Sequence, residues 1–317
     1  MLPPPPDIGS AKTVLLAALA LFAAVYTAFF VRGMLRARDA GSRSATTPTG
    51  GGVLTGFITN FFDTLGVGSF ASTTSIFRFW NMVPDERIPG TLNVGHTLPA
   101  IVQSFIFTRI VPVESRTLIF MIAAAITGAW LGAGVVASWP RRNIQLGMGL
   151  ALAGAAALMM LNLFHLTPGG GDALALTGSR LALAVGVNLV LGALMTLGIG
   201  LYAPCMILIS ALGMNPVAAF PIMMGSCAFL MPVASIRFIR FRRFDPRAAV
   251  GLLIGGLPAV LIAAFVVKSL PLTAVRWLVV VVVLYTAVTL LRAAAVSAAR
   301  SPLLPHEPHR SRAGPGQ

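Results

Sequence analysis

The sequence predicts an all-α polytopic membrane protein with two pseudo-symmetric halves, and three observations support this. Hydrophobic residues make up 56% of the 317 residues, only 10% are charged, and the mean hydropathy is +0.86; soluble domains carry about 25% charged residues. Several apolar runs reach the roughly 20 residues that cross a bilayer as a helix, without the alternation of a membrane barrel. The stretch TLGVGSFA, which begins at Thr64, has a counterpart in TLGIGLYA, which begins at Thr196.

This paired stretch predicts a break in a helix of each half. Glycine inside a helix costs about 1 kcal/mol relative to alanine, whereas its conformational freedom suits backbone that must bend or approach a ligand. In membrane transporters, matched glycine-interrupted segments in the two halves are the best sequence indication of the binding site. We therefore expect the two breaks to face a common centre.

The predicted organisation is an extra helix, two repeats and a tail. The parts are 1–50 (extra helix and basic linker), 51–166 (first repeat), 167–179 (linker), 180–296 (second repeat) and 297–317 (a disordered, basic, proline-rich tail). The first apolar run lacks the basic start and the small-residue cleavage site of a secretory signal, so we expect it to be retained.

The elements follow in order from the apolar runs. The first repeat is expected to contain 53–65 and 69–83 on either side of its break, then 88–110, 116–139 and 143–166, and it follows a first span at 13–31. The second is expected to contain 180–197 and 201–212 around its break, then 217–238, 246–267 and 272–294. Gly128 and Gly132 have the small-residue spacing that allows close helix packing.

Two topologies remain open for the interrupted segments. Each would be roughly 48 Å long as a straight helix of about 32 residues, more than the 30 Å or so of the hydrocarbon core. This length favours two re-entrant hairpins beside seven full spans, with inverted repeats; full crossing would give nine spans and parallel repeats. Both satisfy the positive-inside rule and put the C-terminus in the cytoplasm, for a multi-pass protein of a bacterial inner membrane.

The net charge is +14, from 23 Lys and Arg against 9 Asp and Glu, and the basic residues lie mostly at the ends of apolar runs. There they set membrane orientation and meet anionic lipid, so no nucleic-acid partner is expected. Cys205 and Cys227 are expected to be buried small side chains, with a disulfide or metal pair as the less favoured alternative. No cofactor, metal site or catalytic residue is predicted.

Asp63 is the acidic residue that lies well inside an apolar run, and its counterpart in the second half is Met195. A carboxylate in a bilayer is costly and normally marks a functional site, so Asp63 is a candidate proton carrier or anion gate. Alternatively, it accepts backbone N–H groups released at the break, as a helix cap does. The two roles are compatible.

His96 follows in the next span and titrates near neutral pH. It can pair with Asp63 or bind an anion when protonated, or it can be a neutral side chain bonded to a neighbouring helix. Asparagine and glycine exchange places between the halves, because Asn60 aligns with Gly192 and Asn188 with Gly56. These asparagines are candidates for ligand contact or for interhelical hydrogen bonds.

Helices that restart after the breaks would point their free N–H groups and positive dipole ends at the centre, forming an anion site largely of backbone. Asp63 and His96 are the candidates for proton coupling. The predicted substrate site comprises Asn60, Asp63, Gly66, Gly68, Ser69, Asn93, His96, Thr97, Gly198, Gly200, Tyr202 and Ser226.

The glycine-broken starts, the element Pro89-Gly90-Thr91 and the duplicated four-segment layout resemble the TauE/SafE family of bacterial membrane permeases. The resemblance covers about 51–294 and implies export of sulfite, sulfonates and related small anions. The chain departs from the family in having fewer glycines at each break and a more polar first half, with Asp63 and His96. The resemblance therefore bears more on fold than on substrate.

The predicted function is secondary transport of a small anion bound near mid-membrane between the two breaks, and the resemblance implies export as its direction. The expected partners are this anion and the lipid bilayer, and the small-residue spacings are compatible with a homodimer. A non-transporting scaffold or assembly protein is the alternative from another class. An intramembrane enzyme is a weaker one, because only Asp63 with His96 could supply its catalytic pair.

Overall fold

The computed structural model describes residues 8–39, 46–166, 170–198, 200–266, 280–281, 284–285 and 287–296. Regular structure in these ranges is helical, apart from an isolated bridge between Ala173 and Met214. Within the described residues, six helices are long and apolar enough to cross a membrane. The prediction of a helical, multi-pass membrane protein is confirmed at this level. Ser297–Gln317, much of 272–294 and part of the linker at 167–179 lie outside the described residues.

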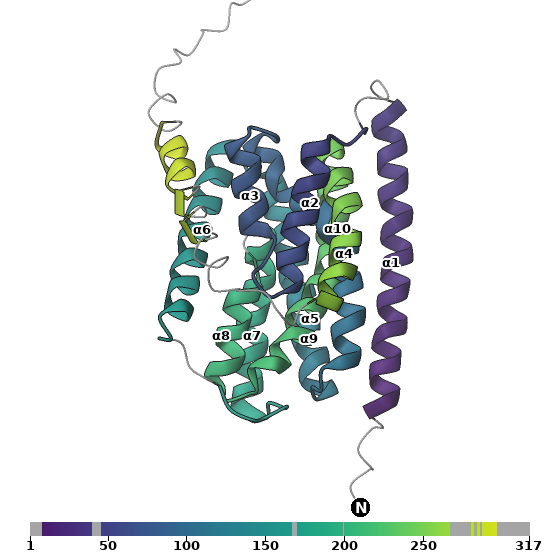
Figure 1. The fold of residues 1–317 in the computed structure, drawn as a ribbon, viewed down its shortest axis with the longest axis vertical. Helices are drawn as coiled ribbons and strands as arrows, with labels where there is room; N and C mark the ends of the chain where they lie inside the picture. The colour runs from purple at the N-terminus through teal and green to yellow at the C-terminus, as the bar shows by residue number, and fades with distance from the viewer. Residues whose placement is uncertain are drawn as a thin grey trace, which may run out of the picture.

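The longer helices run from one end of a bundle to the other, whereas the shorter ones run only part of the way (Figure 1). The helices are α1 (Ile8–Asp39), α2 (Gly50–Thr64), α3 (Phe70–Phe79), α4 (Ile88–Ile110), α5 (Ser115–Ser138), α6 (Arg141–Leu163), α7 (Gly178–Met195), α8 (Tyr202–Ala211), α9 (Ala219–Arg240) and α10 (Pro246–Val266), with 3₁₀ turns η2 (Asp85–Arg87) and η3 (Pro216–Ala218). A further apolar helix is described at Ala287–Val296. These bounds agree with the predicted runs to within a few residues, except that α1 is longer at both ends.

Helices α4 and α9 pack against each other at the centre of the bundle. Helix α4 has 23 residues but is not among the six apolar helices, because it carries Asn93, His96, Thr97 and Gln103. All four of these side chains are buried. A polar helix of this kind is stable in a membrane only when protein surrounds it, and here α2, α3, α9 and α10 contact it.

Two outer helix pairs flank this centre, and each joins helices from different halves of the chain. Among the described helices, the most extensive contacts are those of α2 with α10 and of α5 with α7. Glycines allow both crossings. A Cβ on Gly56 would lie 2.6 Å from the Leu252 backbone, and a Cβ on Gly128 would collide with the backbone oxygen of Leu189. Each glycine therefore lets two helix backbones approach closely.

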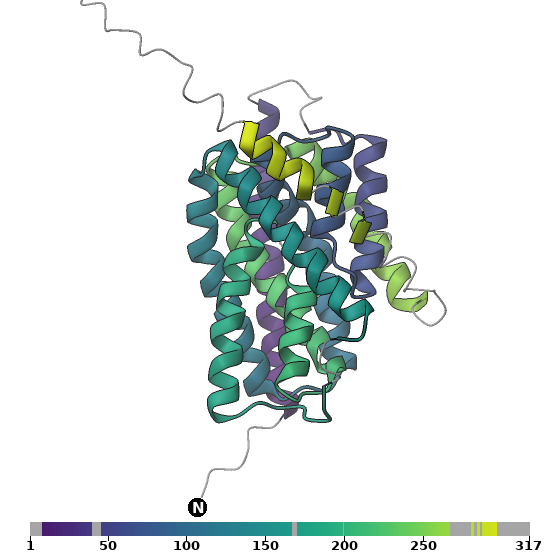
Figure 2. The same ribbon diagram turned by 90° about the vertical axis from the view of Figure 1, so that its left-hand side faces the viewer.

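Helices α1 and α6 lie on opposite sides of these pairs (Figure 1). Helix α1 is tied to the centre by Tyr26, whose hydroxyl donates to the Val94 carbonyl at 2.6 Å. Figure 2 shows α6 crossing the other helices obliquely. Gly149 of α6 lies against Leu291, so the helix Ala287–Val296 packs on α6.

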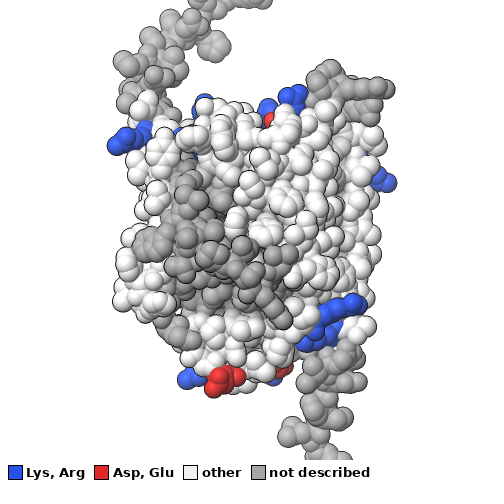
Figure 3. Space-filling view, viewed as in Figure 1, with Lys and Arg blue, Asp and Glu red and all other residues white. Residues whose placement is uncertain are grey.

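On the face drawn in Figure 3, the charged side chains of the described residues gather toward the two ends of the bundle. The basic end, where α4, α6 and α10 begin and α1, α5 and α9 end, carries Arg32, Arg36, Arg78, Arg87, Arg141, Arg142, Arg237, Arg240, Arg242, Arg243 and Arg247. The opposite end carries Lys12, Arg109, Arg116 and Arg180, and Lys12 donates to the Val111 carbonyl there at 3.4 Å. The charge distribution is therefore strongly unequal.

The interrupted segments occupy opposite halves of the bundle (Figure 1). Helix α2 starts at the basic end beside α10, and α3 ends at the same end beside the start of α6. Helix α7 starts at the opposite end, where the Leu176 N–H donates to Thr117 at 3.0 Å. Helix α8 ends there as well, beside the bridge between Ala173 and Met214. Both breaks consequently lie near the middle of the molecule.

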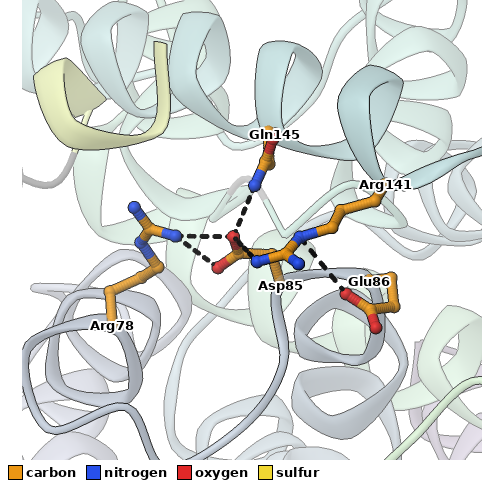
Figure 4. Close-up of polar contacts among 5 residues, drawn as sticks. All are labelled: Arg78, Asp85, Glu86, Arg141 and Gln145. Atoms are coloured by element: carbon orange, nitrogen blue, oxygen red, sulfur yellow. Dashed lines mark hydrogen bonds and ion pairs between the residues drawn. The ribbon is translucent and has the colours of Figure 1, made fainter. Parts of the chain in front are cut away.

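A buried carboxylate fixes the basic end of α3 (Figure 4). Arg78 Nη1 lies 2.6 Å from Oδ1 and from Oδ2 of Asp85, and Gln145 of α6 donates to Oδ2 at 2.7 Å. Arg141 approaches Asp85 at 3.6 Å and Glu86 at 3.7 Å. The Asp85 side chain is only 4% exposed, against 20% for Arg78. This cluster joins α3, η2 and α6.

We expect Arg78→Met to lower the free energy of unfolding by about 3 kcal/mol, because it leaves the Asp85 carboxylate buried without its closest cation. Thermal unfolding in detergent measures this with a fluorogenic maleimide, since Cys205 and Cys227 are free and buried until the protein unfolds. Arg142→Met, at an exposed position of the same end, is the matched control. Equal stability of the two variants would contradict a structural role for the ion pair.

Helix α5 begins with a capping carboxylate. Glu114 accepts the backbone N–H groups of Arg116 at 2.9 Å and Thr117 at 2.7 Å. Partial burial alone would raise the pKa of Glu114, but hydrogen bonds from Thr117 and Arg116 and the charge of Arg116 together lower it. The cap is therefore strongest with the carboxylate ionised.

Glu114→Ala is expected to cost about 1 kcal/mol of stability at neutral pH, the usual value of a lost helix cap. Because the folded-state pKa is depressed, this contribution is complete above the unfolded-state value of about 4.5 and disappears as the pH falls through the folded-state pKa. Unfolding of both proteins at pH 7 and at progressively lower pH tests this. A gap that stays constant would show that the charge is irrelevant.

Candidate functional site

The two breaks begin in the same way, with a glycine that ends the preceding helix. Gly66 and Gly198 adopt φ values of +83° and +93°, a region that favours glycine. The Gly66 N–H donates to the Asp63 carbonyl at 2.8 Å, and the Gly198 N–H donates to the Met195 carbonyl at 3.0 Å. The chain then restarts as α3 at Phe70 and as α8 at Tyr202. The predicted breaks are thus present in both halves.

A small cavity of about 10 Å³ lies between the breaks. Its walls come from both breaks and from the central helices: Asp63, Gly68, Ser69, Phe70, His96, Ala100, Met195, Gly200, Leu201, Tyr202, Cys227 and Met231. This volume is close to the minimum that holds one water molecule. In this conformation the centre is therefore closed around a space smaller than any oxyanion.

Asp63 is held by partners from three parts of the chain. Its Oδ2 accepts from Gln103 Nε2 of α4 at 2.9 Å and lies 3.2 Å from the Tyr202 hydroxyl. That hydroxyl also lies 2.9 Å from Gln103 Oε1, so its single proton can be donated to either oxygen. The hydroxyl and backbone N–H of Ser69 also interact with the carboxylate. Both predicted roles of Asp63, site residue and cap, fit this arrangement.

No lysine or arginine of the described chain forms a salt bridge with Asp63. Its carboxyl group, 5% exposed, depends on neutral hydrogen-bond donors. Burial of an ionised carboxylate is costly even with such donors. Asp63 is therefore a buried carboxyl group that only neutral groups stabilise within the described chain.

His96 lines the same cavity but has partners of its own. Its Nδ1 lies 3.1 Å from Asn60 Oδ1, and its Nε2 lies 3.1 Å from Thr73 Oγ1. Asn60 is fixed in turn, because its Nδ2 donates to the Gly56 carbonyl at 2.7 Å. Asn60 therefore orients the ring, with Nδ1–H as the donor to its amide oxygen. Asp63 and His96 thus line one cavity with different direct partners, and Thr64 connects these partners by accepting from Gln103 at 2.9 Å and donating to the Asn60 carbonyl at 2.8 Å.

The second half of the chain contributes mainly sulfur atoms and backbone groups to the cavity. Met195 and Cys227 lie 3.6 Å apart through their sulfur atoms, and both line the cavity. Asn188, which aligns with Gly56, donates to the Met121 carbonyl at 2.6 Å and to Ser226 at 3.2 Å. It therefore joins α7 to α5 and α9. The polar groups facing the cavity come largely from the first half.

Seven of the twelve predicted site residues lie at or beside the cavity: Asn60, Asp63, Gly68, Ser69, His96, Gly200 and Tyr202. The other five do not line it. Gly66 faces Phe220, and Gly198 faces Leu92. Asn93 donates to the Pro89 carbonyl, Thr97 lies 3.3 Å from Ser235, and Ser226 contacts Asn188.

Gln103 is the main polar contributor that was not predicted from the sequence. It is fully buried and links Asp63, Thr64 and Tyr202. It lies seven residues after His96 in the same helix, and this spacing puts both side chains on one helix face. The sequence could have indicated Gln103 as a polar residue within an apolar run, on the same helix face as His96.

Among the described residues, no three His, Cys, Asp or Glu side chains lie close enough to hold a metal ion. The chain matches no protein-family model, no curated protein and no solved structure. Its activity must therefore be inferred from the chemistry of its own side chains.

Proposed function

We propose that the protein is a secondary transporter of a small anion, bound at the cavity between the two breaks. The observation that carries the proposal is a closed mid-bundle cavity lined from both breaks and containing a buried carboxylate. Matched broken helices that meet at the middle of a membrane protein are the usual setting of a transporter's binding site. A buried ionisable group at that depth is by default functional.

The α2–α3 and α7–α8 pairs act in this proposal as re-entrant hairpins of two inverted repeats. Each pair begins and ends at one end of the bundle, and the two pairs use opposite ends. Contacts between helices support the duplication. In the two repeats α2 corresponds to α7 and α10 corresponds to α5, and the α2–α10 contact is matched by the α7–α5 contact. The excess of arginines at the basic end favours a cytoplasmic position for that end, in a bacterial inner membrane.

The anion would be bound by the restarting helices rather than by a cation. Ser69 and Leu201 precede α3 and α8, and both line the cavity with the first residues of those helices. Free N–H groups and positive helix ends stabilise negative charge in such positions. Two like unit charges about 5 Å apart repel by roughly 3 kcal/mol at an effective dielectric constant of about 20. An anion beside Asp63 would therefore bind together with a proton on that carboxyl group.

The hydrogen bonds around Asp63 accommodate both protonation states. With Asp63 ionised, Tyr202 donates to the carboxylate. With Asp63 protonated, its O–H donates to the Tyr202 oxygen, and Tyr202 donates to Gln103 Oε1 instead. The distances of 3.2 and 2.9 Å allow either arrangement without movement of the side chains. Proton uptake would thus require only reorientation of one hydroxyl.

Transport requires the closed cavity to open alternately toward each side of the membrane. Movement of the hairpins against the central helices would do this, as one repeat moves against the other. A carrier of this kind works in both directions, so the anion would leave the cell when its outward concentration gradient exceeds the inward proton gradient. The resemblance to TauE/SafE permeases makes sulfite and small sulfonates the first substrates to test.

Purified full-length protein in proteoliposomes tests the proposal. We expect uptake of radiolabelled sulfite or a small sulfonate above protein-free vesicles, increased by an inside-alkaline pH gradient. Absence of movement for a panel of small oxyanions, in either direction, would refute transport. A non-transporting scaffold would in addition leave Ser69→Cys and Leu201→Cys inaccessible to maleimides from both sides, in a background with Cys205 and Cys227 replaced by alanine.

A further inference from the structure

A second, larger cavity lies at the basic end, away from the closed central site. Its volume is about 440 Å³, and its walls include Thr49, Met82, Arg87, Asp245 and Arg247. Helices α2 and α10 both begin at its edge, with Thr49 capping α2 through Gly52 at 3.1 Å. Helix starts favour negative charge. Two arginines therefore face one opening, beside the capped starts of two helices.

Asp245, the acidic residue of this wall, is already used within the fold. Its Oδ1 accepts the Ala248 N–H at 2.9 Å and so caps α10. Arg87 and Arg247 are both exposed, and guanidinium groups bind phosphate oxygens in pairs. With two guanidinium groups against one carboxylate, the wall of the cavity has a net positive charge, which favours a phosphate group.

An apolar groove of about 430 Å³ continues from this cavity, since both are lined by Thr49 and Met82. The groove runs between α2 and α3 and is lined by Leu54, Ile58, Ile76 and Trp80. Leu54 is 59% exposed and Trp80 is 64% exposed. Exposed tryptophan is typical of the membrane interface, and exposed aliphatic side chains face acyl chains.

We propose that this continuous surface binds an anionic phospholipid, with its phosphate at Arg87 and Arg247 and an acyl chain in the groove between α2 and α3. A basic pocket between membrane helices is a recurrent headgroup site. A free phosphate would use only the polar cavity, whereas a lipid occupies both parts. The site is independent of the transport proposal.

Fluorescence quenching of Trp80 by brominated phospholipids tests the proposal. The protein contains four tryptophans, and the other three are changed to phenylalanine. Brominated phosphatidylglycerol should quench Trp80 with about tenfold preference over brominated phosphatidylcholine, as expected for two basic residues near a headgroup. Arg87→Gln combined with Arg247→Gln should remove this preference. Arg142→Gln, an exposed arginine at the same end, should retain it.

Native mass spectrometry of the wild-type chain provides a readout that does not depend on the tryptophan changes. Retained phosphatidylglycerol should be lost in the double arginine variant and also in Gly51→Leu, whose side chain would fill the groove next to Met82. Equal binding of both lipids by the wild type, or a preference that survives the double variant, would overturn the site. Competition by inorganic phosphate without any effect of Gly51→Leu would identify a free-phosphate site and refute the lipid.

Discussion

Asp63→Asn is expected to lower anion accumulation in proteoliposomes about tenfold under a gradient of about one pH unit, because such a gradient supplies about 1.4 kcal/mol for each proton carried with the anion and asparagine carries none. Asparagine keeps the size of the side chain and accepts from Gln103, but it cannot gain or lose a proton. The neutral amide does not repel the anion, so exchange of labelled for unlabelled anion should continue. Accumulation and exchange, measured in the same vesicles, separate coupling from binding.

Anion binding should depend on pH through the protonation of Asp63. Protonation of Asp63 increases as the pH falls, so anion binding to the wild type should strengthen with falling pH and that to Asp63→Asn should not. Asp172→Asn removes an exposed carboxylate and is the matched control. Unchanged accumulation and pH dependence in Asp63→Asn would show that Asp63 acts only as a helix cap. Loss of exchange as well would show that the carboxylate is needed for binding itself.

Gly128→Leu is expected to destabilise the fold by more than about 3 kcal/mol, beyond the usual range of overpacking. A Cβ at this position would collide with the Leu189 backbone oxygen and would lie 3.0 Å from the Ala193 nitrogen. Backbone atoms cannot rotate away as a side chain can, so α5 and α7 would have to separate. The maleimide unfolding assay and size-exclusion chromatography measure the loss.

The same substitution at Gly186 of α7 is the matched control, because nothing lies within 4 Å of a Cβ there. Gly186→Leu should be neutral or slightly stabilising, by up to about 0.8 kcal/mol, since leucine favours helix over glycine. Similar losses for both variants would indicate a general intolerance of leucine instead of a close crossing. Intact stability in Gly128→Leu would contradict the crossing itself.

Local patterns predicted the helices and the breaks. Hydropathy places α4 and α5 almost to the residue, and the repeated Gly66 and Gly198 identify where the backbone turns. These features depend on neighbouring residues alone. Asp63 and His96 were conspicuous for the same reason, because ionisable groups in apolar runs are rare.

Features that depend on the partner of a side chain were not predictable. Gln103 reaches Asp63 and Tyr202 only because α4 passes between the two breaks, and no local pattern specifies that neighbour. Asn60 and Asn188 occupy similar sequence contexts, yet one orients His96 and the other joins α7 to α5. The residue types were informative, whereas their roles followed from packing between segments distant in the chain.

The pairing of α2 with α10 has a consequence for biosynthesis. Helix α2 is made early, but its most extensive partner begins at Pro246, roughly 180 residues later, which is about 10–40 s at typical rates of synthesis. During that interval the glycine-lined face of α2 has only lipid or other proteins beside it. A ribosome that stalls before α10 would leave an unpaired hairpin in the membrane, a form that quality-control proteases can recognise.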